Sequence, residues 1–340
     1  MEPWNNLLSN LEPDEIESIY LAVCDQRLSY PYQPSYPPLN PERHDSGISG
    51  VPAEEKDIKP ASRSNDIFPS LEDSTVVCRQ EHPTQDDFDS AAWVSTKQNG
   101  MTQYWAPRYT APPHSNTSPS ARLLYMSNLK TAAIAQSTRK GCTAVDLSAG
   151  SGAVAFSYAA AGVQKVLCWD SNPWSIEGLR RGAIKNRWHV QVHNGDQIQG
   201  KTVQMSSKTR VMAFVEPGDK APGRISRLRS SLPPVTHVNC GFRPTSRDSL
   251  ATAVAVLDPR LGGWISVHET YRMEEVVHGA NKISAEFEIL VETLDRKRGY
   301  LTNVKGIPRR PVIHHIQRIG SETPGVLHCT VDIHIPPIRI

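Results

Sequence analysis

The sequence has little of what zinc proteins, disulfide-rich proteins and membrane proteins require. Its six cysteines are scattered, and none belongs to a C-x-x-C pair or a His-rich cluster. His189 and His193 stand four apart, but in a strand-like context where this spacing does not juxtapose them as a helix would. No apolar run is long enough to span a bilayer, and no secretory signal opens the chain. These absences predict a soluble, cytoplasmic protein without metal or membrane contacts.

Charge is distributed unevenly along the chain. Residues 1–90 carry 18 Asp and Glu against 6 Lys and Arg, whereas residues 91–340 carry 17 against 31. Basic side chains gain affinity for phosphates by releasing counterions, which favours a polyanionic partner for the basic part. An acidic tail beside an ordinary basic enzyme explains the same composition, so both interpretations stay open.

Three regions follow from the composition. Residues 1–85 are rich in Pro, Ser and acidic residues and predict a disordered arm, with one short amphipathic helix around 13–23. Residues 86–136 predict a small segment in which Asn99-Gly100 closes a β-hairpin and a helix spans about 118–136. Residues 137–340 predict the main domain.

Strands and helices alternate regularly in the main domain. This alternation predicts a Rossmann-like α/β fold, a mainly parallel sheet with helices on both faces. The expected strands are 143–149, 165–170, 209–216, 235–242, 262–270 and 326–335, and the expected helices are 152–162, 172–188 and 248–258. The polar stretch 200–231 predicts an exposed basic insertion, which offers a polyanionic partner the side chains of Lys201, Lys208, Arg210, Arg224, Arg227 and Arg229.

Two acids, Asp146 and Asp170, end two successive expected strands. Small residues follow the first acid, namely Ala149, Gly150 and Gly152, and lead directly into a helix whose N-terminus offers free N–H groups. Ligands of open parallel sheets bind at this edge, so Asp146 is expected to engage the amino end of a ligand and Asp170 a ribose. The third glycine of a dinucleotide fingerprint is absent. A purely structural strand–turn–helix unit is the alternative.

Further motifs make the pattern more specific. The D-x-x-A-G-x-G loop with a later acid resembles the S-adenosylmethionine site of Rossmann-like methyltransferases. The chain also contains, in order, "WAPRYT" (105–110), "WDSNPWSIEGLRRGAIKNRW" (169–188), "HVNCGFRPTS" (237–246), "GGWISVHE" (262–269) and "GVLHCTVDIHI" (325–335). From about residue 86 to 335 it resembles the fungal form of the tRNA wybutosine-synthesising aminocarboxypropyltransferases, which are related to tRNA guanine methyltransferases.

This resemblance implies a specific reaction. Family members transfer the 3-amino-3-carboxypropyl group of S-adenosylmethionine to 4-demethylwyosine, the base beside the anticodon of phenylalanine tRNA. It further implies that Asp170 holds the cofactor ribose and that Glu216 precedes the adenine-contacting turn. Asn239 falls where related methyltransferases carry the Asn of a substrate-facing catalytic motif, although an Asn that caps a turn is the alternative.

The chain departs from the family after "WAPRYT". Pro113, His114 and Ser120 stand where the family has the Ser, Arg and Lys that grip the methionine end of the cofactor, while Asn116, Ala121 and Arg122 remain in register. We therefore expect weaker cofactor binding, with protonated His114 as a partial substitute.

Three functions remain in competition from the sequence. They are the aminocarboxypropyltransferase, a tRNA guanine methyltransferase, and a catalytically degenerate member that binds tRNA or partner proteins. For the acceptor base we expect an aromatic stacking partner, for which Trp105, Trp174 and Phe242 are the candidates. Each of the three aromatic residues is equally compatible with a place in the core. The oligomeric state is not predicted.

Overall fold

The computed structural model describes residues 81–113, 122–124, 141–198, 203–228, 230–302 and 306–339. The expected arm up to residue 80 and all but three residues of the expected helix 118–136 lie outside these ranges. So do His114, Ser120, Lys201 and Arg229. Within the described part, no helix combines the length and the hydropathy that crossing a membrane requires.

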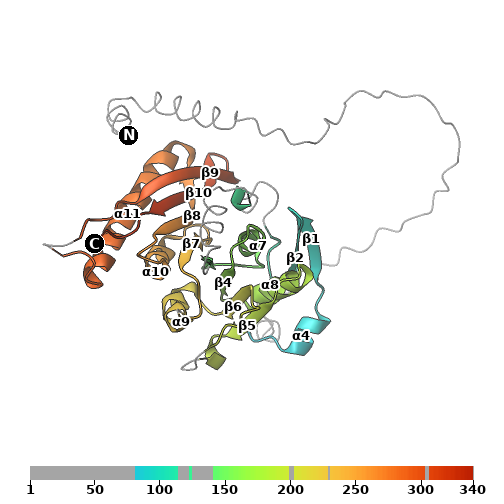
Figure 1. The fold of residues 1–340 in the computed structure, drawn as a ribbon. Helices are drawn as coiled ribbons and strands as arrows, with labels where there is room; N and C mark the ends of the chain where they lie inside the picture. Colours follow the sequence, from blue (N-terminus) through green and yellow to red (C-terminus); the bar gives the residue numbers. More distant parts are fainter. Residues whose placement is uncertain are drawn as a thin grey trace, which may run out of the picture. The chain divides into compact units, whose positions relative to one another are not determined.

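An eight-stranded sheet forms the centre of the described part (Figure 1). Its strand order is β5-β6-β4-β3-β7-β8-β10-β9, in which the first six strands are parallel and β10 and β9 are antiparallel additions. The first strands of this sheet in the chain, β3 and β4, are central; the next two lie toward one edge and the last four toward the other. This order confirms the Rossmann-like expectation. The strands are β3 (Thr143–Asp146), β4 (Lys165–Asp170), β5 (Val190–Asn194), β6 (Val211–Val215), β7 (Val235–Cys240), β8 (Gly263–Arg272), β9 (Val312–Thr323) and β10 (Val326–Ile335).

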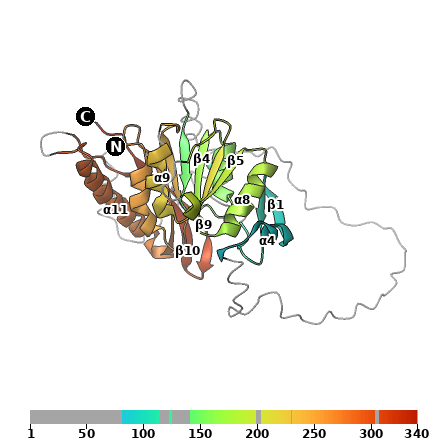
Figure 2. The same cartoon turned by 90° about the horizontal axis from the view of Figure 1, so that it is seen from below.

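Helices cover both faces of this sheet, as Figure 2 shows in a view along its layers. One face packs against α7 (Ala153–Ala160) and α8 (Pro173–Lys185). The other packs against α9 (Ala221–Leu228), α10 (Leu250–Val256) and α11 (Val276–Lys297). The central strands β3 and β4 are almost wholly buried because they contribute apolar side chains to both layers.

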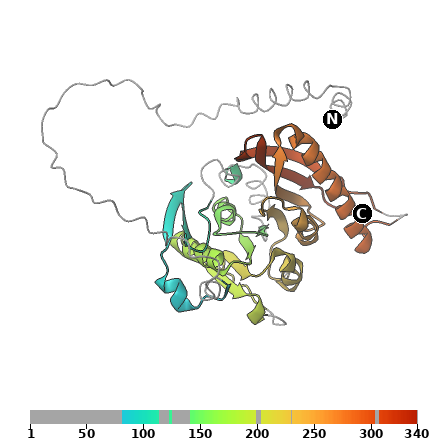
Figure 3. The ribbon, with the colours of Figure 1, turned by 180° about the vertical axis from the view of Figure 1, so that it is seen from behind.

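The predicted hairpin is present and lies alongside α8 (Figure 3). Strands β1 (Val94–Gln98) and β2 (Met101–Trp105) flank Asn99 and Gly100, both with positive φ (52° and 80°), as the favoured two-residue turn requires. Asn186, which follows α8, binds the backbone of Thr102 twice, through Oδ1 to its N–H (2.8 Å) and Nδ2 to its carbonyl (2.8 Å). The side-chain amide of Asn186 thus pairs with the edge of β2 as the backbone of a neighbouring strand would, and this pairing fixes the hairpin to the end of α8.

The stretch expected as an exposed insertion differs from that expectation where it is described. It contributes β6, whose residues 211–214 are buried, and α9, which packs on the core. Arg210 donates a hydrogen bond to the carbonyl of Ala159 (2.8 Å), and Arg224 forms an ion pair with Glu216 (2.7 Å). The strand expected at 209–216 is present as β6 because its continuous apolar run is buried on both faces of the sheet, and these two arginines are engaged by partners within the protein.

Candidate functional site

A cavity of about 330 Å³ opens at the carboxyl ends of the parallel strands. Five of the seven predicted site residues line it: Asp146, Ala149, Gly150, Asp170 and Asn239. They come from the ends of β3, β4 and β7, neighbouring strands whose carboxyl ends meet at one edge of the sheet. The fold thus brings together acids that are distant in sequence, at the edge where ligands of such sheets bind.

Asp170 fixes the glycine loop. Its Oδ2 accepts a hydrogen bond from the N–H of Gly150 (2.9 Å) and its Oδ1 accepts one from the N–H of Asn172 (2.8 Å). Gly150 has a φ of +53° and open space where a side chain would begin, so a ligand can approach its backbone. Burial raises the pKa of Asp170, and the two backbone hydrogen bonds counteract that rise.

Asp146 is fully buried, and one of its two carboxylate oxygens lacks a partner. Its Oδ1 accepts a hydrogen bond from Nδ2 of Asn239 (2.9 Å), whereas its Oδ2 has no hydrogen-bond partner among the described residues. Burial raises the pKa of Asp146 to about 6, against the lowering effect of the Asn239 hydrogen bond. A buried acceptor without a donor costs about 1–3 kcal/mol. Asp146 is among the residues that line the cavity, so the unsatisfied acceptor belongs to the candidate site.

The structure places Gly152 and Glu216 apart from the cavity. Gly152 caps α7 with a φ of +94°, and a side chain there would lie 2.8 Å from the ring of Phe156, so this glycine serves helix packing. The carboxylate of Glu216 accepts two hydrogen bonds from Arg224 (2.9 and 2.7 Å) and one from the indole of Trp169 (3.2 Å). Neither residue is among those that line the cavity.

The residues after the hairpin form one wall of the cavity. Tyr109 lines it and stacks on Trp174, with ring centroids 3.7 Å apart. Asn172, at the N-terminus of α8, donates to the carbonyl of Tyr109 (3.1 Å) and also caps the helix at Trp174 (2.9 Å). One residue, Asn172, therefore links this wall to α8.

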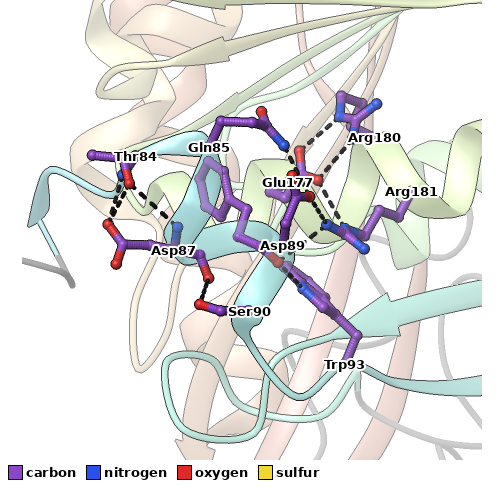
Figure 4. Close-up of polar contacts among 10 residues, drawn as sticks. Thr84, Gln85, Asp87, Asp89, Ser90, Trp93, Glu177, Arg180 and Arg181 are labelled. Atoms are coloured by element: carbon purple, nitrogen blue, oxygen red, sulfur yellow. Dashed lines mark hydrogen bonds and ion pairs between the residues drawn. The ribbon is translucent and has the colours of Figure 1, made fainter.

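A second polar cluster centres on Glu177 of α8, as Figure 4 shows. Its buried carboxylate accepts hydrogen bonds from Arg180 (2.6 and 2.8 Å) and Arg181 (2.8 Å). Arg181 also contacts Asp89 of helix α4 (Gln85–Ser90) at 3.4 Å and lies over the ring of Trp93 at 4.5 Å. These contacts fasten α4 and the start of the hairpin to α8.

A polar row that the sequence did not predict lines the opposite side of the cavity. His268 on β8 and His328 on β10 are adjacent, with Nδ1 and Nε2 3.1 Å apart. Glu322 lies 3.8 Å from His328 and accepts a hydrogen bond from Arg243 (3.1 Å), which also lines the cavity. The antiparallel pairing of β8 with β10 joins residues sixty positions apart, so no local motif marks the pair.

The fold is that of a Rossmann-like α/β protein, and its candidate site is the cavity at the carboxyl edge of the sheet. No protein-family model matches the chain. Its homologues include two curated proteins named tRNA wybutosine-synthesizing protein 2, which confirms the resemblance seen in the sequence. The one from Schizosaccharomyces pombe is 36% identical over 207 residues, covering 61% of this chain and 46% of its own length. The one from Saccharomyces cerevisiae is 26% identical over 263 residues, covering 75% and 51%.

The chain thus spans about half the length of the curated relatives it matches. Among solved structures, TYW2 of M. jannaschii in complex with AdoMet has a TM-score of 0.49 at 15% identity, covering 73% of this chain and 88% of that chain. The M. jannaschii tRNA m1G37 methyltransferase has a TM-score of 0.43 at 12% identity, covering 73% and 58%.

Proposed function

We propose that this protein binds S-adenosylmethionine in the carboxyl-edge cavity and transfers its 3-amino-3-carboxypropyl group to 4-demethylwyosine in phenylalanine tRNA. The unpartnered Oδ2 of Asp146, buried beside Asp170, carries the ligand assignment. The similarity to two curated proteins of wybutosine synthesis supports the choice of reaction. A cytoplasmic location, expected from the sequence, belongs to the same proposal.

The residues of the cavity fit the chemical groups of this molecule. Asp146 offers an acceptor for the amino group, and Asp170 keeps acceptor capacity for ribose hydroxyls beyond its two backbone hydrogen bonds. The open backbone at Gly150 admits a nucleoside at close range. The side chain of Glu216 is held by Arg224, so in this proposal the turn that follows it, rather than its carboxylate, is available to the adenine.

Bound S-adenosylmethionine supplies a sulfonium that makes each attached carbon electrophilic. The protein selects among these carbons by positioning, because the carbon that is held close to the acceptor and in line with it reacts fastest. In this proposal Asp146 fixes the amino end, and Asn239, which donates a hydrogen bond to Asp146 (2.9 Å), also lines the cavity. In this proposal Asn239 orients the acceptor base.

In this proposal Arg243 binds the carboxylate of S-adenosylmethionine, in place of the Ser, Arg and Lys that bind the methionine end in the family and are absent here. Among the described residues that line the cavity, Arg243 is the single Arg, and no Lys lines it. Pro113 also lines the cavity and offers neither a hydroxyl nor an N–H. Since Arg243 supplies the charge, Arg243→Gln is expected to weaken S-adenosylmethionine binding, whereas restoring Ser, Arg and Lys at positions 113, 114 and 120 is expected to strengthen it.

One assay tests the reaction. Phenylalanine tRNA that carries 4-demethylwyosine is incubated with the protein and S-adenosylmethionine labelled in the aminocarboxypropyl group, and the product nucleoside is analysed by mass. We expect the label in the nucleoside and methylthioadenosine as by-product. A product that gains only a methyl group would instead establish a methyltransferase. Binding of S-adenosylmethionine without any product would establish the degenerate binding protein.

A further inference from the structure

One aromatic side chain stands exposed on the segment that supplies two of the cavity-lining residues. Phe242 has 59% of its surface exposed, and among the Phe, Tyr and Trp residues in the described part of the chain it alone is classed as exposed. Its two sequence neighbours, Gly241 and Arg243, both line the cavity. An exposed phenylalanine forgoes the free energy of burial, so its place beside a ligand cavity indicates a partner that covers it.

The backbone that carries Phe242 is held in place. The hydroxyl of Ser246, 1% exposed, has one proton to donate and lies within hydrogen-bond distance of the carbonyls of both Cys240 (2.6 Å) and Phe242 (2.8 Å). Thr245 donates to Glu269 on β8 (2.9 Å) and pairs with it as an isolated bridge. The ring is thus presented from a fixed turn, which lowers the entropy cost of binding a flat partner.

The other aromatic candidates for stacking are occupied. Trp174 is fully buried and packs against Tyr109 and Phe88. Trp105 is partly buried at the end of β2, paired across the hairpin with Val94, and it is not among the residues that line the cavity. Phe242 does not line the cavity either, but it is the most exposed of the three and lies between two residues that do, so its ring is the one open to an incoming base.

We propose that Phe242 is the stacking platform for the acceptor base and that it helps to determine specificity for a large, flat, tricyclic ring. This inference rests on the proposed function for the identity of the base. Single-stranded and flipped bases stack on aromatic side chains, and such stacking grows with the overlapping ring area. Phe242 contributes to binding of the acceptor base, and S-adenosylmethionine binding does not require it.

The test compares two synthetic anticodon stem–loops, one carrying 4-demethylwyosine and one abasic at that position, in the presence of a saturating S-adenosylmethionine analogue. We expect wild type to bind the first about tenfold more tightly, and Phe242→Ala to bind both equally, as loss of one base stack predicts. Phe242→Trp should keep the preference and Phe242→Leu should reduce it. In steady state, Phe242→Ala should raise KM for tRNA more than it lowers kcat.

Ile289→Ala serves as the matched control, because Ile289 is an exposed apolar residue (68%) on α11, remote in sequence from the cavity. It should leave the preference unchanged, and calorimetry should give wild-type affinity for S-adenosylmethionine in every variant. An equal preference in wild type and Phe242→Ala overturns the role of Phe242. A wild-type protein that shows no preference between the two stem–loops and forms no product overturns the proposed function instead.

Discussion

Two cavities of the sheet invite comparison, because the larger one has the poorer chemistry. A cavity of about 460 Å³ lies at the amino ends of β7 and β8, between α9 and α10, and is lined mostly by apolar residues and prolines. Its acid, Asp258, accepts a hydrogen bond from the N–H of Arg260 (2.9 Å). The carboxyl-edge cavity is smaller, at about 330 Å³, but it holds the buried Asp146 with an unpartnered oxygen.

The two cavities differ in chemistry more than in volume, since two acids, two amides and two histidines line the smaller one and mostly apolar side chains line the larger one. Parallel strands direct their helix N-termini and loop N–H groups toward one edge, so polar ligands are favoured there and not at the other. The amino-edge cavity is explained by imperfect packing of apolar side chains, since none of its lining residues has a buried polar atom without a partner among the described residues.

The largest effect is expected from Asp170→Ala. Loss of hydrogen bonds from a charged acceptor should reduce S-adenosylmethionine affinity by about 1.5–3 kcal/mol, measured by calorimetry. Asp258→Ala, the corresponding change in the other cavity, should leave the affinity unchanged. Equal effects of the two substitutions would remove the distinction between the cavities. Wild-type affinity in Asp170→Ala would show that Asp170 does not bind S-adenosylmethionine.

The pH dependence of Asp146 gives the second test. Its pKa of about 6 in the fold lies above the ordinary value of 3.8, so its contribution to the free energy of unfolding falls as pH rises from about 4 to about 6 and is constant above that. The whole shift corresponds to about 3 kcal/mol, of which about half is lost above pH 5, so Asp146→Asn should gain about 1.5 kcal/mol relative to wild type between pH 5 and pH 8. This is measured by urea unfolding at both pH values.

The affinity for S-adenosylmethionine should depend on the ionisation of Asp146 in the opposite direction to stability. An ammonium group favours ionised Asp146, so affinity for S-adenosylmethionine should rise from pH 5 to pH 7 and be flat in Asp146→Asn. Binding that is instead stronger below about pH 6.5 would indicate protonated His114, which lies outside the described residues, as the dominant group.

The wall of the carboxyl-edge cavity depends on close packing at Gly178. A side chain there would approach the carbonyl oxygen of Tyr104 to 2.5 Å, so Gly178→Ala should destabilise the protein by about 1–3 kcal/mol. Gly223→Ala is the matched control, since Gly223 lies on α9 with nothing within 4 Å, and alanine there should be neutral or stabilising. Thermal unfolding of both variants measures the difference, and similar melting temperatures would contradict the docking of the hairpin.

Much of this architecture was predictable, because the buried strands and the Asn99-Gly100 turn carry strong local signals. Helix α11 was not named from the sequence, although its buried Val276, Ala280, Ile283 and Phe287 recur at helical spacing. Strand β9 had no such signal, since it is a partly exposed edge strand with irregular register.

Side-chain partners explain the remaining differences at the site. The sequence placed Glu216 at the end of a strand but gave no sign that Arg224, eight residues later, would hold its carboxylate. Likewise Arg122 remains in register with the family, yet it forms an ion pair with the buried Asp332 on β10, 210 residues away. Such pairings depend on how the sheet closes, which local patterns do not encode.

A smaller effect is expected where the fold begins. The sequence predicts that residues 1–85 are dispensable, but Thr84 caps α4, exchanging hydrogen bonds with Asp87. A chain that starts at Glu81 should melt like the full-length protein, whereas one that starts at Asp86 should lose about 1 kcal/mol. The corresponding shift is roughly 2–4 °C in melting temperature. Equal melting of both shortened chains would show that the cap is unimportant.

The smallest effects concern the exposed basic residues. Neutralising Lys208 or Arg227, both exposed, should each lower the log–log salt slope of tRNA binding by roughly 0.7–0.9. Arg224→Gln should reduce stability and leave the slope unchanged, because Arg224 is held by Glu216. Slopes unaffected by Lys208 and Arg227 would place the tRNA contacts elsewhere.

A co-crystal structure with S-adenosylmethionine tests the central claim most directly. We expect the ligand in the carboxyl-edge cavity, with its amino group on Oδ2 of Asp146 and its ribose hydroxyls on Asp170. Ligand density in the larger cavity between α9 and α10, or a ligand in the carboxyl-edge cavity that leaves Asp146 without a donor, would contradict it.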